Sequence, residues 1–279
     1  MTSPDPVKVG RDTIFADISE LTGMPFPNLL YRRLGEDPRR LEDCWGRVRP
    51  GLARIGHTAL RRLMLDGIDS ADAHAPAARG PEGKISNARP ASGTSPINPG
   101  QAATLLRILS PYDSGNSCNA VVVALLRGGA PGDSSSPLLS TVASTGDALP
   151  TEMVTAPLPP MLEVDDMGTE ARNSVLRLAR LIEPGGRAVP SLFRHIGHDT
   201  ALLDWIESVV TDAAESGALN RCEDSVRAVA ARTAAHWPEP VQPLDDDQVR
   251  KLLQPFETMI PRMLATSTVL RAALSSQLP

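Results

Sequence analysis

PNLLYRRLGED, residues Pro27–Asp37, is the stretch on which the fold of this chain depends, because a related stretch returns later in the sequence. The later stretch is PSLFRHIGHD, residues Pro190–Asp199, and a gap of one residue aligns both of its ends with the first. A second pair follows in the same order, since RILSPYD (Arg107–Asp113) matches KLLQPFE (Lys251–Glu257) in residue type at each position. Two matches in order indicate a duplicated helical unit, and two copies are too few for a solenoid.

The duplication predicts one domain made of two consecutive repeats. We place repeat A at residues 10–127, a linker at 128–164 and repeat B at 165–278. Repeat A contains a loop insertion at 66–100, where 21 of 35 residues are Ala, Gly, Pro or Ser and few large aliphatic side chains occur. We expect the two copies to pack around a pseudo-two-fold axis, with a small-molecule pocket in the cleft between them.

Apolar residues recur at helical spacing outside the two linker segments, which predicts an all-α fold. One apolar run, NAVVVALL at residues 119–126, is long enough and sufficiently β-branched to form a buried strand. A buried helix is favoured for it, because helical patterns flank the run and no partner strand is visible. Prolines are expected to break the helices at Pro38 and Pro111, and to bend or break the last one at Pro255 and Pro261. The helical patterns cover residues 12–22, 26–46, 51–65, 101–127, 170–183, 188–216, 223–236 and 245–278.

Composition excludes several classes of protein. The chain has 279 residues, of which 41% are hydrophobic and 22% charged, as in ordinary globular proteins. Its net charge of −5 is not the basic balance of a nucleic-acid-binding protein. The N-terminal residues contain no apolar segment typical of a signal peptide, and no apolar run reaches the length of a membrane span. The cysteines, Cys44, Cys118 and Cys222, form no CxxC pair, which predicts a reduced cytoplasmic protein without a metal site. The sequence leaves open whether the chain forms a homodimer.

Four segments of this sequence resemble the group I (D,L-type) 2-haloacid dehalogenases. They are Pro25–Leu52, the motif YDSGN at Tyr112–Asn116 with its following apolar run, Pro150–Asp166 and Val189–Trp205. The resemblance covers most of the chain outside residues 66–100. It implies an all-helical fold of two related repeats, with the active site between them.

The resemblance also implies a reaction. In that family a carboxylate and an asparagine activate a water molecule, which attacks C2 of a 2-haloacid and displaces the halide with inversion. No metal, organic cofactor or covalent intermediate takes part. Such a site must hold water in line with the carbon–halogen bond and accept its proton, which a carboxylate in a fairly dry pocket can do.

Residue by residue, the family's site maps unevenly onto this chain. Its asparagine falls on Asn116, and its apolar pocket positions fall on Phe26 and Leu29. A tyrosine of the last helix falls on Phe256, which keeps the ring and loses the hydroxyl. The catalytic aspartate falls on Pro190, and no Asp or Glu occurs from residue 185 to 198. Because losing a general base typically costs ~10²–10⁴ in rate, ordinary haloacid dehalogenation is doubtful for this chain.

Other side chains are candidates for the missing acid or base. Asp113 and Glu257 follow an aromatic residue at equivalent places in the two repeats, where they are either a carboxylate pair or ordinary helix-start acids. His195 lies three residues before His198, so one helix face would carry both. His195 is then a replacement base, one of two metal ligands or a partly exposed histidine beside a cleft.

Further positions are expected to contact a substrate. Ser191 follows Pro190 and is either a carboxylate ligand or a helix N-cap, while Asn116 either faces the cleft or serves as a turn residue beside Gly115. The candidate substrate-binding residues are Phe26, Leu29, Tyr112, Pro190, Ser191 and Phe256. The candidate catalytic residues are Asn116, Asp113, Glu257 and His195.

The sequence supports three hypotheses about function. The first is a diverged, cofactor-independent enzyme that hydrolyses, eliminates or cyclises a small or medium-sized organic acid in the cleft between the repeats. The second is a non-catalytic binding or assembly protein that keeps the dehalogenase scaffold. The third is a true dehalogenase whose base comes from another position. Convergent polar groups with a perturbed histidine or carboxylate would favour an enzyme.

Overall fold

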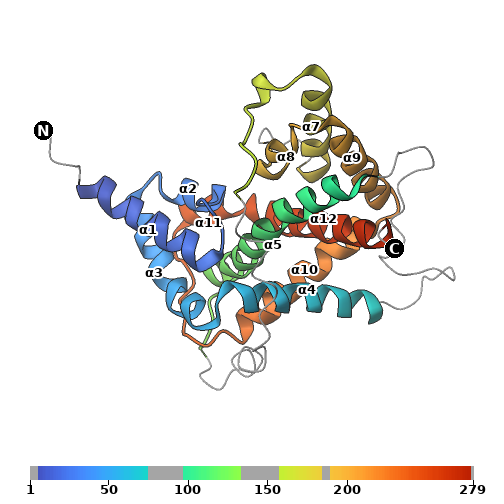
Figure 1. Cartoon of the computed structure of the whole chain (residues 1–279). Coiled ribbons are helices and arrows are strands. Elements are labelled where there is room, and N and C mark those ends of the chain that lie inside the picture. Colours follow the sequence, from blue (N-terminus) through green and yellow to red (C-terminus); the bar gives the residue numbers. More distant parts are fainter. Residues whose placement is uncertain (1–5, 75–96, 133–156, 184–188, 278–279) are drawn as a thin grey trace, which may run out of the picture. The chain divides into compact units, whose positions relative to one another are not determined.

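The computed structural model describes residues 6–74, 97–132, 157–183 and 189–277, which fold into helices and their connections (Figure 1). Within these residues the only β contact is an isolated antiparallel bridge between Ala130 and Val241. This confirms the all-α prediction. The helices are α1 (Pro6–Thr22), α2 (Leu29–Leu34), α3 (Pro38–Ile55), α4 (His57–His74), α5 (Pro99–Gly128), α7 (Thr169–Ile182), α8 (Ser191–Ile196), α9 (Thr200–Glu215), α10 (Ala218–Ala235), α11 (Asp247–Leu253) and α12 (Phe256–Gln277), with a 3₁₀ turn at Val164–Asp166.

The chain divides into two compact units that are each discontinuous in sequence. Unit 1 comprises Met1–Asp66, Asp113–Leu149 and Arg227–Ile260. Unit 2 comprises Gly67–Tyr112, Pro150–Val226 and Pro261–Pro279. The predicted repeats at 10–127 and 165–278 are a different division, and they and their pseudo-two-fold packing stay predictions.

In unit 1, α1 and α2 both pack against α3, and α11 packs against α2. The apolar face of α3 is buried along the helix at Leu41, Trp45, Val48, Leu52 and Ile55, a spacing of three to four residues. Polar contacts add to this packing. The Trp45 indole N–H donates to Asp17 of α1 at 2.6 Å, and the Arg49 guanidinium binds the same carboxylate at 2.7 Å.

In unit 2, α7 packs against α9, and α8 contacts both of them. Both helices bury apolar side chains, among them Leu178 of α7 and Trp205 of α9, which are fully buried. Arg177 of α7 also forms an ion pair with Glu207 of α9. The Arg262 guanidinium donates to the backbone carbonyl of Leu181 at 3.3–3.4 Å, which ties the C-terminal end of α7 to α12.

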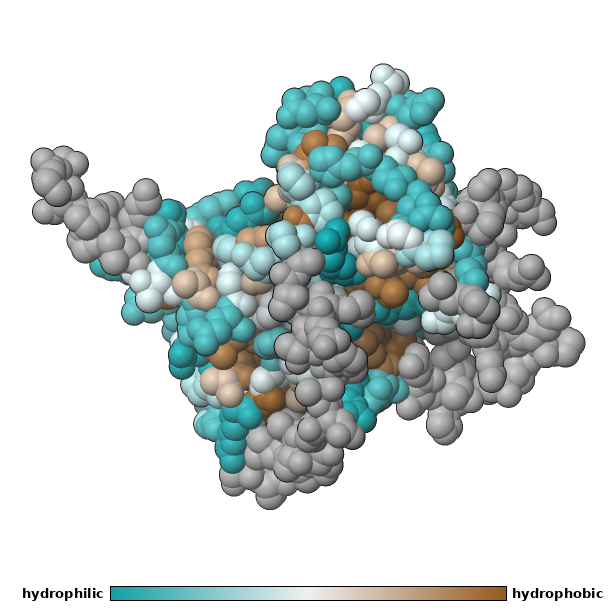
Figure 2. Space-filling view, viewed as in Figure 1, coloured by the Kyte–Doolittle hydropathy of each residue, from teal (hydrophilic) through white to brown (hydrophobic). Residues whose placement is uncertain are grey.

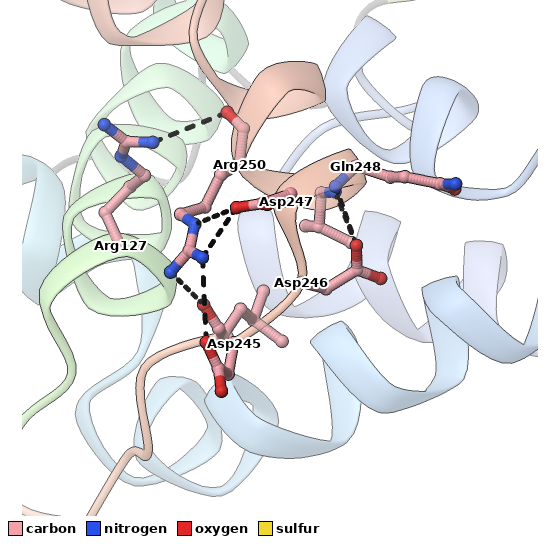
Figure 3. Close-up of polar contacts among 8 residues, drawn as sticks. Arg127, Asp245, Asp246, Asp247, Gln248 and Arg250 are labelled. Carbon is pink, nitrogen blue, oxygen red and sulfur yellow. Dashed lines mark hydrogen bonds and ion pairs between the residues drawn. The ribbon is translucent and has the colours of Figure 1, made fainter.

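Aspartate N-caps begin the helices that follow the short connections. Asp37 caps α3, Asp199 caps α9 and Asp246 caps α11, each by accepting from backbone N–H groups of the first turn. Figure 3 shows the third of these caps, where an Asp246 oxygen accepts from Gln248 N at 2.7 Å. Asp247 then adds an acidic side chain to the first turn of α11.

The acidic turn is balanced by one arginine. Arg250, one turn further along α11, binds the Asp247 carboxylate at 2.7 Å and reaches Asp245 at 3.6 Å (Figure 3). Its own backbone carbonyl accepts from the Arg127 guanidinium near the end of α5 at 3.5 Å. These side chains are largely exposed, so their ion pairs contribute little stability and mainly orient the start of α11.

Several predicted boundaries are wrong. Helix α4 runs on to His74, so the loop predicted at 66–100 is shorter, and residues 75–96 of it lie outside the described part of the chain. Helix α5 continues through Pro111, where a break was predicted, and α12 continues through Pro261, where a bend or a break was predicted. A proline removes one helical hydrogen bond, and here the buried residues on either side, such as Ile108 and Tyr112, hold the helix together. The run at 119–126 is helical and buried, as predicted.

None of the described helices combines the length and apolarity of a membrane span. On the face shown in Figure 2, hydrophilic residues predominate and hydrophobic residues show in smaller areas between them. This pattern is what amphipathic helices produce when they bury their apolar faces.

Replacing each of two glycines of α3 by alanine should change the stability of unit 1 in opposite directions. A Cβ on Gly51 would lie 2.3 Å from the indole nitrogen of the buried Trp237, whereas a Cβ on the exposed Gly46 meets nothing within 4 Å. Gly46→Ala should stabilise unit 1 by ~0.5–1 kcal/mol through helix propensity. Gly51→Ala should destabilise it by ~1–3 kcal/mol through overpacking. Urea unfolding of both variants measures the two signs, and a stabilising Gly51→Ala would contradict this packing.

Candidate functional site

Helix α5 carries a run of polar side chains through the interior of unit 1. Transfer of such groups from water to an apolar interior is costly unless partners satisfy them. A run of buried polar side chains therefore marks a candidate functional site, because apolar side chains would pack there at a lower cost in free energy. The buried polar residues of the run are Asp113, Ser114, Asn116, Ser117 and Asn119, each at most 5% exposed.

The segment between α1 and α2 lies against this part of α5, and two glycines allow the approach. A Cβ on Gly115 would lie 2.2 Å from Cγ of Met24, so a side chain at this position would displace the segment. Gly23 has a φ of +68°, and a Cβ there would lie 2.8 Å from the Ser114 hydroxyl. The absence of side chains at these two positions brings residues 23–28 onto the polar run.

Ser114 joins three elements through its hydroxyl group. It donates to the backbone carbonyl of Thr22 at 3.0 Å, and its oxygen lies 2.8 Å from Nδ1 of His57 at the start of α4. Because the single hydroxyl proton is used on Thr22, His57 Nδ1 must be the donor in the second contact. Burial, together with the positive charge of Arg61, lowers the pKa of His57. Ser114 is thus a structural link and not an activated nucleophile.

Asn116 is held by the N-cap of α2. The side-chain amide of Asn28 donates to Oδ1 of Asn116 at 3.4 Å. The other end of the Asn28 amide accepts from the backbone N–H of Leu30 at 3.3 Å, as an N-cap residue does. Asn28 was missed in the sequence, although its place directly before an apolar helical pattern is a recognised N-cap signal.

Both candidate carboxylates of unit 1 lie next to an arginine. The fully buried Asp113 lies 3.8 Å from the guanidinium of Arg61 on α4. Glu257, in the first turn of α12, forms an ion pair with Arg127 of α5. Each charge is therefore balanced within unit 1, and the acid pair predicted from the repeat stays a prediction.

His195, in unit 2, is buried in α8 and tied to the backbone of the preceding segment. Its Nδ1 lies 2.6 Å from the carbonyl oxygen of Pro159, so Nδ1 carries a proton and Nε2 is the acceptor nitrogen of the neutral ring. The ring of Tyr112 meets the imidazole edge-on, with centroids 6.0 Å apart. Burial lowers the pKa of His195, and the bond to Pro159 opposes this effect. The net effect of this environment is to favour the neutral form of the ring.

Residues around His195 form hydrogen bonds with the backbone of the proline-rich segment that precedes α7. His198 Nε2 donates to the carbonyl of Pro160 at 2.7 Å, and Arg194 donates to the carbonyl of Leu162 at 2.8 Å. Both histidines of the HxxH pattern thus bind backbone carbonyls of consecutive prolines. Among the described residues, no group of three His, Cys, Asp or Glu side chains is placed to hold a metal ion.

The remaining candidate residues are apolar or lie at helix ends. In unit 1, Phe26 and Leu29 flank Asn28 and are partly exposed, whereas Phe256 is buried at the start of α12. In unit 2, Pro190 occupies the N-cap position of α8 and Ser191 is the first helical residue, so the predicted Ser191 N-cap is wrong by one position. The Pro190 carbonyl accepts from Phe193 N at 3.1 Å.

Two solved structures share the fold of this chain over nearly its whole length. One is a mutant D-2-haloacid dehalogenase, with a TM-score of 0.64 and 12% sequence identity, covering 98% of this chain and 93% of that one. The other is a D-2-haloacid dehalogenase mutant in complex with D-2-CPA, with a TM-score of 0.63 and 14% identity, covering 98% and 96%. No family model matches the chain, and neither does any curated protein sequence. The likeness shows the fold.

Proposed function

We propose that this chain is a diverged member of the group whose fold it shares, and that it acts without metal or organic cofactor on a small or medium-sized organic acid. The fold agreement spans nearly all of both chains, which is more than a shared helical motif. Fold alone does not carry function, so the proposal depends on the site.

The observation that carries the proposal is the buried amide of Asn116. It lies at the position where the resemblance places the family's asparagine, and it is 5% exposed in a run of buried polar residues. Partly exposed apolar side chains, Phe26 and Leu29, come from the same segment as its partner Asn28. An amide beside apolar side chains is the usual composition of a small-molecule site.

The chemistry must differ from that of the dehalogenases at the base. Pro190 stands where the family's aspartate falls, and a proline ring can accept no proton. Within unit 2, His195 is the candidate replacement, because its pKa is lowered and its tautomer leaves Nε2 as the basic nitrogen. We therefore infer a hydrolase- or lyase-type reaction in which the slow step needs no carboxylate at position 190.

We also infer that the chain arose by duplication. Helices α2 and α8 both have six residues, and each is followed by a helix capped by an aspartate, Asp37 in one case and Asp199 in the other. In unit 1, α1 precedes the short helix α2 and packs against α3, which follows it. In unit 2, α7 precedes the short helix α8 and packs against α9 in the same way. These parallels support the repeat that the sequence matches predict.

Binding of small acids to the full chain tests the proposed function. We expect 2-chloropropionate and lactate to bind, and Asn116→Ala to weaken both by at least about tenfold through loss of a hydrogen bond to a charged group. Asn173→Ala, an exposed asparagine on α7, is the matched control and should bind normally. Ligand-observed NMR gives the affinities, and an ion electrode gives halide release. Absence of any binding would favour the non-catalytic scaffold, and halide release by the unchanged chain would favour a relocated base.

A further inference from the structure

We propose that Asn28 is a positioning residue that turns the Asn116 amide so that its NH₂ group, and not its carbonyl oxygen, faces the ligand. The group of the ligand that is held there is then a hydrogen-bond acceptor, and in an organic acid this is a carboxylate oxygen. The inference rests on the proposed function, since it names the part of the substrate that this site would recognise.

The backbone of α2 decides which way the Asn28 amide points. Asn28 is the N-cap, and the Leu30 N–H lies 3.3 Å from its Oδ1. Turning the amide over would place NH₂ against that N–H group, so that two donors would face each other. The oxygen of Asn28 therefore stays on the helix, and its NH₂ group points away from the helix.

The orientation of the Asn28 amide then fixes the orientation of the Asn116 amide. The Asn28 Nδ2 is 3.4 Å from the Asn116 side chain, and a donor there requires the oxygen of Asn116 as acceptor. Both N–H donors of Asn116 remain at the opposite end of the amide. Within the described part of the chain, Asn28 is the only side chain or backbone group that forms a hydrogen bond with the Asn116 side chain.

An NH₂ group without a protein acceptor is available to a ligand that supplies one. Asn116 is 5% exposed as a residue, yet its Nδ2 is not one of the fully buried side-chain atoms that lack a partner, so this nitrogen is open to a small ligand or to water. A carboxylate oxygen is the strongest acceptor that an organic acid offers to a neutral amide.

The variant Asn28→Asp tests this inference. Aspartate has the same shape and caps helices as well as asparagine does, but both of its oxygens are acceptors. An oxygen facing Asn116 demands the NH₂ group of that amide, so Asn116 should turn over and present its oxygen to the ligand. The variant therefore exchanges the hydrogen-bond donor that Asn116 presents to the ligand for an acceptor, and it does so without truncating either side chain.

Three related probes separate this reversal from a simple charge effect. They are 2-chloropropionate, its methyl ester and its primary amide, measured by NMR titration of the full chain. The acid and the ester offer only acceptors, so each should bind at least about tenfold more weakly to the variant. The amide can donate to the turned oxygen and should stay within about threefold. Loss of the acid alone indicates charge repulsion, and loss of all three indicates damage; either result overturns the proposal.

A measurement without ligand keeps the inference separate from the proposed function. In protein labelled with ¹⁵N-asparagine, the Asn28 side-chain NH₂ protons should exchange slowly with water and those of Asn116 quickly. In Asn28→Asp, the Asn116 protons should become protected and move downfield, because they then donate to a carboxylate. Protected Asn116 protons in the unchanged chain would overturn the inference, even if small acids bind. If no acid binds but the exchange pattern holds, only the proposed function fails.

Discussion

Pro190→Asp is expected to raise halide release from 2-chloropropionate by about 10²–10⁴-fold over the unchanged chain, because it supplies a carboxylate where the resemblance places the family's general base. The backbone at Pro190 has a φ of −56° and a ψ of 134°, which aspartate adopts without strain. Aspartate is also a preferred N-cap residue, so α8 should keep its start. The rate is measured as chloride produced by each enantiomer separately.

Two controls separate a restored base from a general change at this helix. Pro190→Asn has nearly the same shape as Pro190→Asp but no proton-accepting carboxylate, and it should release no more halide than the unchanged chain. Val189→Asp places the same carboxylate one residue earlier and should be far less active. Equal rates for all three variants would show that position 190 does not correspond to the family's aspartate.

Arg61→Met should lower the free energy of unfolding by about 3–5 kcal/mol, because it leaves the carboxylate of Asp113 in the interior without the guanidinium beside it. The Asp113 side chain is 0% exposed and the Arg61 side chain is 19% exposed, so solvent cannot replace the lost charge. Chemical denaturation followed by far-ultraviolet circular dichroism measures the loss. A change below ~1 kcal/mol would mean that other groups carry the compensation for Asp113.

If the charge of Asp113 causes the loss of stability, removing that charge as well should restore it. The double variant Arg61→Met with Asp113→Leu removes both charges and should recover most of the lost stability, since well-packed apolar pairs often replace buried ion pairs without cost. The exposed ion pair Arg33–Glu36, with both side chains 59% exposed, gives a matched control. Arg33→Ala should change stability by less than ~1 kcal/mol. Failure of the double variant to recover would point to a packing role of the Arg61 stem.

Local sequence patterns predicted the helices well where the apolar spacing was regular. The helical pattern at residues 26–46 and its interruption before Pro38 are found, since α2 ends at Leu34 and α3 begins at Pro38. The buried helix at residues 119–126 also followed, because flanking helical patterns outweighed its β-branched composition. Proline positions predicted the helix ends near Pro38 and Pro255 but not at Pro111, where buried neighbours keep α5 continuous.

The partners of the polar residues could not be read from the sequence. The sequence analysis identified Asn116 through a family resemblance, yet Asn28 lies 88 positions away from it. His195 was read as a metal ligand, a base or a bystander, and only the carbonyl of Pro159, 36 positions earlier, shows which nitrogen is protonated. Such contacts depend on long-range packing, which local periodicity does not encode.

By itself, the sequence determined that this chain is helical, along which stretches most of its helices lie, and that position 190 holds no carboxylate. These properties follow from hydrophobic periodicity, capping residues and residue identity, which are local. The tertiary structure alone decided that Asn28 reaches Asn116, that Arg61 reaches Asp113, and that glycines at positions 23 and 115 admit the loop onto α5. The partner of a buried amide or carboxylate lies on a segment that is distant in the chain. Only the packing of the helices brings the two groups within hydrogen-bond or ion-pair distance.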